Sequence, residues 1–202
     1  MTTAEGIAFV YATLREDPSS DRLPLSAVLQ AANLGYIDLF HQTRCAKETY
    51  TVKTAANVAQ YPLPSNMFDV LDKCNAVTFN GQSLPHGAPH NRYFGFGVSP
   101  RSWHKDDAFS ITLTPAPVSA GILTVTGHVT PSSTDATYPL LVNSTGSFQL
   151  TAETDAGPWY YAVVNIAATI LADDAGAQSR AQSCVSLYQD CVKKLAARLW
   201  QG

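Results

Sequence analysis

The sequence contains few charged residues. Asp, Glu, Lys and Arg together make up 14% of its 202 residues, against about 25% in an ordinary globular domain. Disordered chains are rich in charge and poor in aromatic residues, whereas this chain is 10% aromatic, so the low charge does not indicate disorder. The net charge of −3 excludes the basic excess of a nucleic-acid-binding chain. We therefore expect a folded protein whose surface is wetted by uncharged polar residues or covered by neighbouring molecules.

Cysteines and long apolar runs are also scarce. The four cysteines are scattered and form no C-x-x-C pair, which excludes a disulfide scaffold and favours a reduced, intracellular protein. No stretch approaches the roughly 20 apolar residues that cross a bilayer. The first residues have neither the basic nor the apolar region of a secretory signal. We expect no membrane as a partner.

The motifs of common enzymes are absent. The chain has no G-x-S-x-G, P-loop or H-E-x-x-H pattern, and Gly95-Phe96-Gly97 lacks the third glycine of a dinucleotide fingerprint. The paired carboxylates Asp106-Asp107 and Asp173-Asp174 are adjacent in predicted turns, where their side chains point apart. We expect no catalytic residue and no cofactor.

Two groups of residues have the chemistry of metal ligands. A histidine and aspartate group could meet in one folded loop, although these residues are also common in polar loops. Its members are His86, His90, His104, Asp106 and Asp107. Cys184 and Cys191 lie seven residues apart on one predicted helix, too far apart to form a disulfide with each other. We interpret them as buried thiols and expect no metal site.

Apolar residues recur with the period of a helix near both ends of the chain. The predicted helices cover residues 3–15, 24–43, 158–172 and 178–199. Thr2 and Glu5 have the spacing of a capping box at the start of the first helix. The short link between the last two helices predicts an antiparallel helical hairpin. A heptad-like apolar stripe on the last helix consists of Ala181, Cys184, Tyr188, Cys191 and Leu195.

Between these helices the apolar period changes to two, which is typical of strands. The predicted extended segments are 48–54, 58–63, 68–71, 76–79, 82–84, 108–113 and 122–129. Asn80-Gly81 predicts a two-residue hairpin turn. The last two segments are expected to pair as antiparallel neighbours. Residues 85–107 and 131–156 are expected to be long irregular stretches, and loops of that length are usually functional.

The segregation of helices and strands predicts an α+β fold. Helices from opposite ends of the chain can meet only if the β part is an insertion that leaves and returns at one place. We therefore expect a helical bundle formed by the N- and C-terminal helices, residues 1–46 and 157–202, with an antiparallel β-rich subdomain inserted at residues 47–156.

Several short motifs occur in an order that resembles a known family. They include Leu25-x-x-Val28-Leu29, Tyr50-Thr51-Val52, Tyr61-Pro62-Leu63-Pro64, the hairpin at 77–84, Leu113-Thr114-Pro115-Ala116-Pro117, Ile122-Leu123-Thr124-Val125, Ala167-Ala168 and Tyr188. Over residues 23–199 this order resembles the head-to-tail adaptor proteins of tailed bacteriophages, also described as head completion or tail tubular protein A-like proteins.

The resemblance implies a structural virion protein without an active site. Such proteins form a ring, typically dodecameric, between the portal protein and a tail nozzle or tail terminator protein. The ring continues the DNA channel, and the DNA passes through without sequence-specific binding. The resemblance also implies synthesis in the host bacterial cytoplasm and a final place in the head–tail neck of the virion.

Two groups of residues are candidates for contacts with other proteins, where aromatic and arginine side chains are enriched. The basic and aromatic C-terminal end is predicted to face the portal; it contains Lys194, Arg198, Leu199 and Trp200. The predicted loop at 85–107 is expected to face the tail side or a neighbouring subunit through Tyr93, Phe94, Phe96 and Trp103. The same loop aromatics leave open an alternative function, a β-rich binding module for a carbohydrate or a host-surface ligand.

Overall fold

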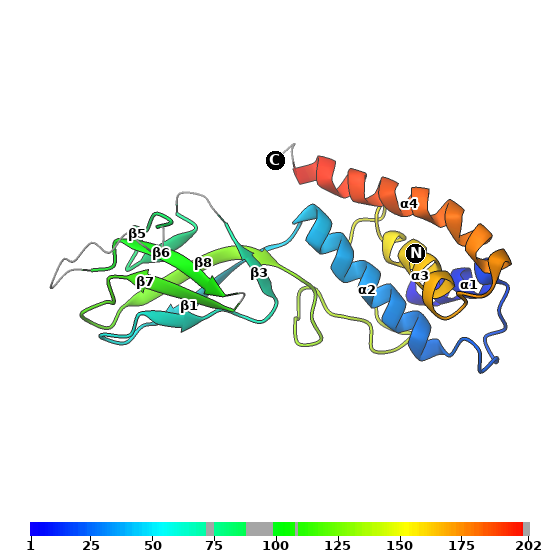
Figure 1. Ribbon diagram of the computed structural model, residues 1–202, viewed down its shortest axis with the longest axis horizontal. Helices are drawn as coiled ribbons and strands as arrows, with labels where there is room; N and C mark the ends of the chain where they lie inside the picture. Colours follow the sequence, from blue (N-terminus) through cyan, green and yellow to red (C-terminus); the bar gives the residue numbers. More distant parts are fainter. Residues whose placement is uncertain (72–74, 88–98, 108, 200–202) are drawn as a thin grey trace. The chain divides into compact units, whose positions relative to one another are not determined.

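The chain folds into two compact units. The fold comes from a computed structural model that describes residues 1–71, 75–87, 99–107 and 109–199 (Figure 1). A helical unit combines Met1–Cys45 with Thr130–Gly202, and a β unit contains Ala46–Val129. Helices and antiparallel sheets are thus segregated, which confirms the predicted α+β class.

All four predicted helices are present, and their ends lie within a few residues of the predicted ones. They are α1 (Thr3–Leu14), α2 (Leu25–Thr43), α3 (Gly157–Thr169) and α4 (Ala175–Leu199). The capping box of α1 is confirmed, because Thr2 Oγ1 accepts a hydrogen bond from the Glu5 backbone N–H at 3.3 Å and Glu5 Oε2 accepts one from the Thr2 N–H at 2.7 Å. The two bonds satisfy N–H groups that a helix start otherwise leaves without partners.

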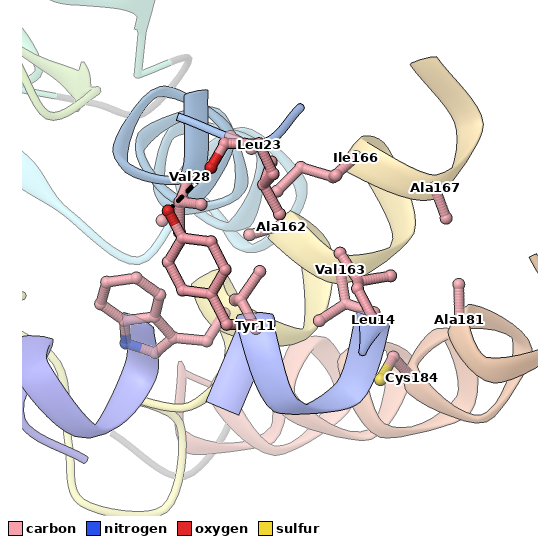
Figure 2. Packing of buried hydrophobic residues seen from close by; sticks show 14 of the residues in the cluster. Tyr11, Leu14, Leu23, Val28, Ala162, Val163, Ile166, Ala167, Ala181 and Cys184 are labelled. Carbon is pink, nitrogen blue, oxygen red and sulfur yellow. Dashed lines mark hydrogen bonds between the residues drawn. The ribbon is translucent and has the colours of Figure 1, made fainter. Parts of the chain in front are cut away.

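Helices from both ends of the chain share one apolar core. Buried side chains from all four helices pack into a single cluster, which includes Leu14 of α1, Val28 of α2, Ile166 of α3 and Cys184 of α4 (Figure 2). The Tyr11 hydroxyl crosses this core and donates a hydrogen bond to the Leu23 carbonyl at 2.9 Å. This packing confirms the predicted bundle of N- and C-terminal helices.

The irregular stretch between the last strand and α3 packs with the helices. Leu141 is buried in the helical core, and the Phe148 ring lies 4.5 Å from that of Tyr36 and 5.5 Å from that of Trp159. Residues 130–156 therefore group with the helical unit, whereas the predicted β subdomain at 47–156 included them. The reason is that two apolar side chains, Leu141 and Phe148, attach this stretch to the helices. They belong to no periodic apolar pattern, so the sequence does not reveal this attachment. The predicted domain bounds, 1–46 with 157–202 for the bundle and 47–156 for the insertion, remain a prediction.

The β unit contains two antiparallel sheets. Its strands are β1 (Lys47–Lys53), β2 (Gln60–Pro62), β3 (Met67–Val70), β4 (Val77–Phe79), β5 (Gln82–Ser83), β6 (Ser102–Asp107), β7 (Ser110–Thr114) and β8 (Ile122–Val129). One sheet has the order β1-β8-β4-β5, and β3 also pairs with β8. The other sheet has the order β2-β7-β6. The turn between β4 and β5 is the predicted one, with Asn80 at φ 48° and Gly81 at φ 78°, as a type I′ hairpin requires.

Two strand predictions are wrong. The predicted neighbours 108–113 and 122–129 belong to different sheets, because β7 pairs with β2 and β6 while β8 pairs with β1, β3 and β4. The segment between them, which contains Pro115, Pro117 and Gly121, carries the chain from one sheet to the other instead of closing a hairpin. The predicted loop at 85–107 contains strand β6, whose sequence SWHKDD has one large apolar residue and therefore no apolar alternation.

Candidate interaction surfaces

Helix α4 uses a narrow side for the core and exposes the rest. Its buried residues recur every three or four positions; they are Ala177, Ala181, Cys184, Tyr188, Cys191 and Leu195. This set contains the complete predicted stripe. Val185 and Leu187 flank the stripe and are exposed. Most of the described residues of α4 are thus exposed.

The basic end of α4 is exposed where the structure describes it. Lys194 Nζ lies 2.7 Å from Asp190 Oδ2, an ion pair one helical turn long. The hydrogen bond to Asp190 raises the pKa of Lys194. Arg198 is exposed in the last turn, where a cation also complements the helix dipole. The side chain of Leu199 and the whole of Trp200 lie outside the described residues.

Trp103 serves the core of the β unit. It lies in β6, is 5% exposed, and its ring packs 4.6 Å from that of His86. Its expected place in a loop is therefore wrong, and little of its ring is available to another molecule. Trp159 is likewise buried in the helical core, so neither tryptophan offers the open ring face that sugar stacking needs. Tyr93, Phe94 and Phe96, the other predicted contact residues of this group, lie outside the described residues.

The polar residues around β6 have structural partners. His104 Nε2 lies 2.9 Å from Asp106 Oδ1, and the Thr112 hydroxyl donates a hydrogen bond to Asp106 from the neighbouring strand. Asp107 accepts a hydrogen bond from the Phe109 backbone N–H at 2.7 Å, which lowers the pKa of that carboxyl. In the described part of the chain no group of three or more His, Cys, Asp or Glu side chains is placed to bind a metal. His90 lies outside that part.

The described cysteines do not resemble nucleophiles. Cys184 and Cys191 are buried free thiols, as predicted, and Cys45 is a partly buried one. Burial raises the pKa of all three, which lowers the fraction of reactive thiolate.

A first apolar groove lies between α2 and the irregular segment at 140–142. Its volume is about 420 Å³. It is lined by Ser26, Leu29, Gln30, Asn33, Leu34, Ile37, Leu140, Leu141 and Val142, none of which is charged. The Asn33 side chain holds the segment from both sides, because its Nδ2 donates to the Leu141 carbonyl and its Oδ1 accepts from the Leu141 N–H, both at 2.9 Å. With Leu141 turned into the core, Val142 is 79% exposed.

A second groove lies between α3 and α4, with a volume of about 640 Å³. It is lined by Val164, Ala167, Ala168, Ala175, Gln178, Ser179, Ala181, Gln182 and Val185, again without a charged residue. Motif and period searches do not reveal either groove. The apolar triplet Leu140-Leu141-Val142 in an otherwise polar stretch is a signal that could have indicated the first groove, but it was not used in the prediction.

These surfaces are suited to association with other proteins. The grooves are lined by uncharged residues, more of them apolar than polar, and the described helices include none long and apolar enough to cross a membrane. The family model described as SU10 adaptor protein matches residues 1–201, while no individually curated protein matches the chain. That match covers both units and agrees with the resemblance carried by the short motifs. The chain therefore belongs to the SU10 adaptor protein family, a family of phage head-to-tail adaptors.

Proposed function

We propose that this adaptor assembles into a ring between the portal and the tail, and that the ring continues the channel through which DNA leaves the head. The family match over residues 1–201 is the observation that carries this proposal. Adaptors of phages are structural components of the virion that contact other head and tail proteins, and the family is not typically enzymatic. The ring, its dodecameric size and the DNA channel are the part proposed here.

The surface chemistry of the chain supports a ring around DNA. A ring forms when two different patches of one subunit pair repeatedly and the rotation closes, and uncharged patches can be covered without burying unpaired charge. A lumen that lets DNA slide must not neutralise many phosphates, because each such contact strengthens binding. The net charge of −3 is consistent with DNA transit and with no grip on the DNA.

The portal side of the ring is proposed to be the C-terminal end of α4. Lys194 and Arg198 are exposed there, and they are followed in sequence by Leu199 and Trp200. An exposed helix end with cations and a large aromatic residue suits a contact with another protein. We assign Tyr93, Phe94 and Phe96 to the opposite contact, which is with the tail nozzle, the tail terminator or a neighbouring subunit. Trp103 is not assigned to this contact because its ring is buried.

Co-sedimentation with portal rings from the same phage tests the proposal. The full chain is expected to sediment with the portal, and a chain lacking residues 198–202 is expected to stay in the supernatant with an unchanged circular dichroism spectrum. Arg198→Glu should weaken docking, whereas the matched control Arg15→Glu, also an exposed arginine of the helical unit, should not. Undiminished docking of the truncated chain would reject the C-terminal contact, and absence of docking by the full chain would reject the adaptor ring at the portal.

A further inference from the structure

The segment at 140–142 presents an aliphatic side chain in a fixed position. Two hydrogen bonds from Asn33 hold the Leu141 backbone against α2, and Leu141 itself is buried. Val142, the next residue, is 79% exposed and therefore faces outward. Of the large apolar side chains in the described ranges, Val142 is the most exposed. Burying this exposed valine is favourable because it removes apolar surface from water, and on a segment anchored this way it costs little further conformational entropy.

The groove between α3 and α4 has the size and lining to accept such a side chain. Ala167 and Ala168 of α3 and Ala181 of α4 line it beside polar side chains of α4, and alanines leave room between two helices for a branched side chain from outside. Val185 stands at the rim and is itself exposed. The volume of about 640 Å³ exceeds that of a single valine. Leu34, which is 44% exposed, lines the first groove together with Val142 and is the second apolar side chain on that surface.

The two surfaces match in charge and lie on different parts of the helical unit. Among the described residues that line the two grooves none is ionisable, so pairing them buries no unpaired charge. In α2 the lining residues Gln30, Asn33 and Ile37 occupy another side of the helix than the buried Val28 and Ala32. The second groove involves only α3 and α4. A copy that uses one surface therefore keeps the other free for a further copy.

We propose that Val142 and Leu34 of one copy dock into the α3–α4 groove of a second copy of this chain. The inference deepens the proposed function, on which it rests, by assigning the contact between neighbouring subunits. Pairing of two different surfaces is heterologous, so it propagates from copy to copy and closes into a ring when the rotation permits. The alternative is that a portal or tail protein, and not a second copy, binds one of these surfaces. The following experiments distinguish the two.

Directed cross-linking tests which residues meet. Chains carrying Val142→Cys are mixed with chains carrying Ala168→Cys, alone and on portal rings, and treated with a short bismaleimide. A cross-linked dimer is expected only in the mixture, and a chain with both substitutions should give a ladder of higher oligomers. Val118→Cys mixed with Ala168→Cys is the matched control, because Val118 is also an exposed valine outside helices and strands; it should give only the background of the native thiols.

Charge variants test the strength of the contact. Val142→Asp is expected to weaken self-association at least about tenfold, measured by sedimentation velocity, because a buried carboxylate replaces an apolar contact. Val118→Asp should leave it unchanged. Ala168→Lys should also weaken association, and a mixture of the Val142→Asp and Ala168→Lys chains should recover part of it.

The outcomes distinguish this inference from the proposed ring. Rings that form on the portal without a 142–168 cross-link, or that tolerate Val142→Asp, overturn the assigned contact and leave the ring in place. A cross-link from residue 142 to the portal or tail protein also overturns it. Failure of the native chain to self-associate, alone or on portal rings, overturns both.

Discussion

Replacing Gly6 with alanine tests the packing of α1 on α3. Gly6 is buried, and a Cβ atom there would lie 2.2 Å from Cε2 and 2.3 Å from Cδ2 of Trp159. The indole is 1% exposed and packs 5.5 Å from the ring of Phe148. The atoms that the new methyl group meets therefore belong to a ring held on several sides.

Two effects of opposite sign decide the outcome. Alanine favours a helix interior over glycine by about 1 kcal/mol, whereas overpacking a filled core typically costs about 1–3 kcal/mol. Because the clash is with a buried ring and not with the end of a flexible side chain, we expect overpacking to win. Gly6→Ala should lower the free energy of unfolding by about 1–2 kcal/mol.

Urea unfolding followed by far-ultraviolet circular dichroism measures this change, since all four helices contribute to the signal. Gly176→Ala is the matched control: its Cβ would meet only side-chain atoms of Arg180 and Asp174 in an exposed first turn, so it should be neutral or stabilising. Combining Gly6→Ala with Trp159→Phe should recover part of the loss, because the smaller ring makes room. A Gly6→Ala chain that is stabilised as much as the control would refute the packing of α1 on α3.

Three further predictions concern single contacts. Asn33→Ala removes both hydrogen bonds to Leu141 and should lower the free energy of unfolding by about 1–3 kcal/mol; an unchanged urea midpoint would contradict the anchoring of the segment. Gly81→Val places a β-branched residue at φ 78° and should cost about 1 kcal/mol or more in a thermal melt, whereas no loss would contradict the type I′ turn. The Ala177 backbone N–H donates a hydrogen bond to Asp174 at the start of α4 and, with Arg22, lowers the pKa of this carboxyl below its usual 3.8. The ionised Asp174 carboxylate should therefore stabilise the fold fully above about pH 4, and this stabilisation should be lost as the pH falls through the lowered pKa. Asp174→Asn should reduce that acid dependence of the unfolding midpoint, and an identical pH profile would contradict the assignment.

The helices could be predicted from the sequence because their apolar residues keep one period over three or more turns. In α4 the stripe from Ala181 to Leu195 coincides with the buried side. Strand pairing could not be predicted in the same way. Strand β6 has a single large apolar residue, and the separation of β7 and β8 into two sheets depends on tertiary pairing that no local pattern encodes.

The candidate surfaces were only partly predictable, for a related reason. Trp103 appears as a loop aromatic in the sequence, but pairing of β6 with β7 turns its ring into the core of the β unit. The groove beside α2 depends on Asn33 and Leu141, which are 108 residues apart in sequence. Exposure of Val142 follows from that long-range contact, and a one-dimensional pattern cannot show it.

Single-particle imaging of the native chain bound to portal rings tests the central claim most directly. A closed ring of adaptor subunits with a continuous open lumen on the portal axis is predicted, with the C-terminal ends of α4 against the portal. Separate subunits bound at unconnected positions, or a ring whose centre is blocked by protein, would contradict a connector that passes DNA.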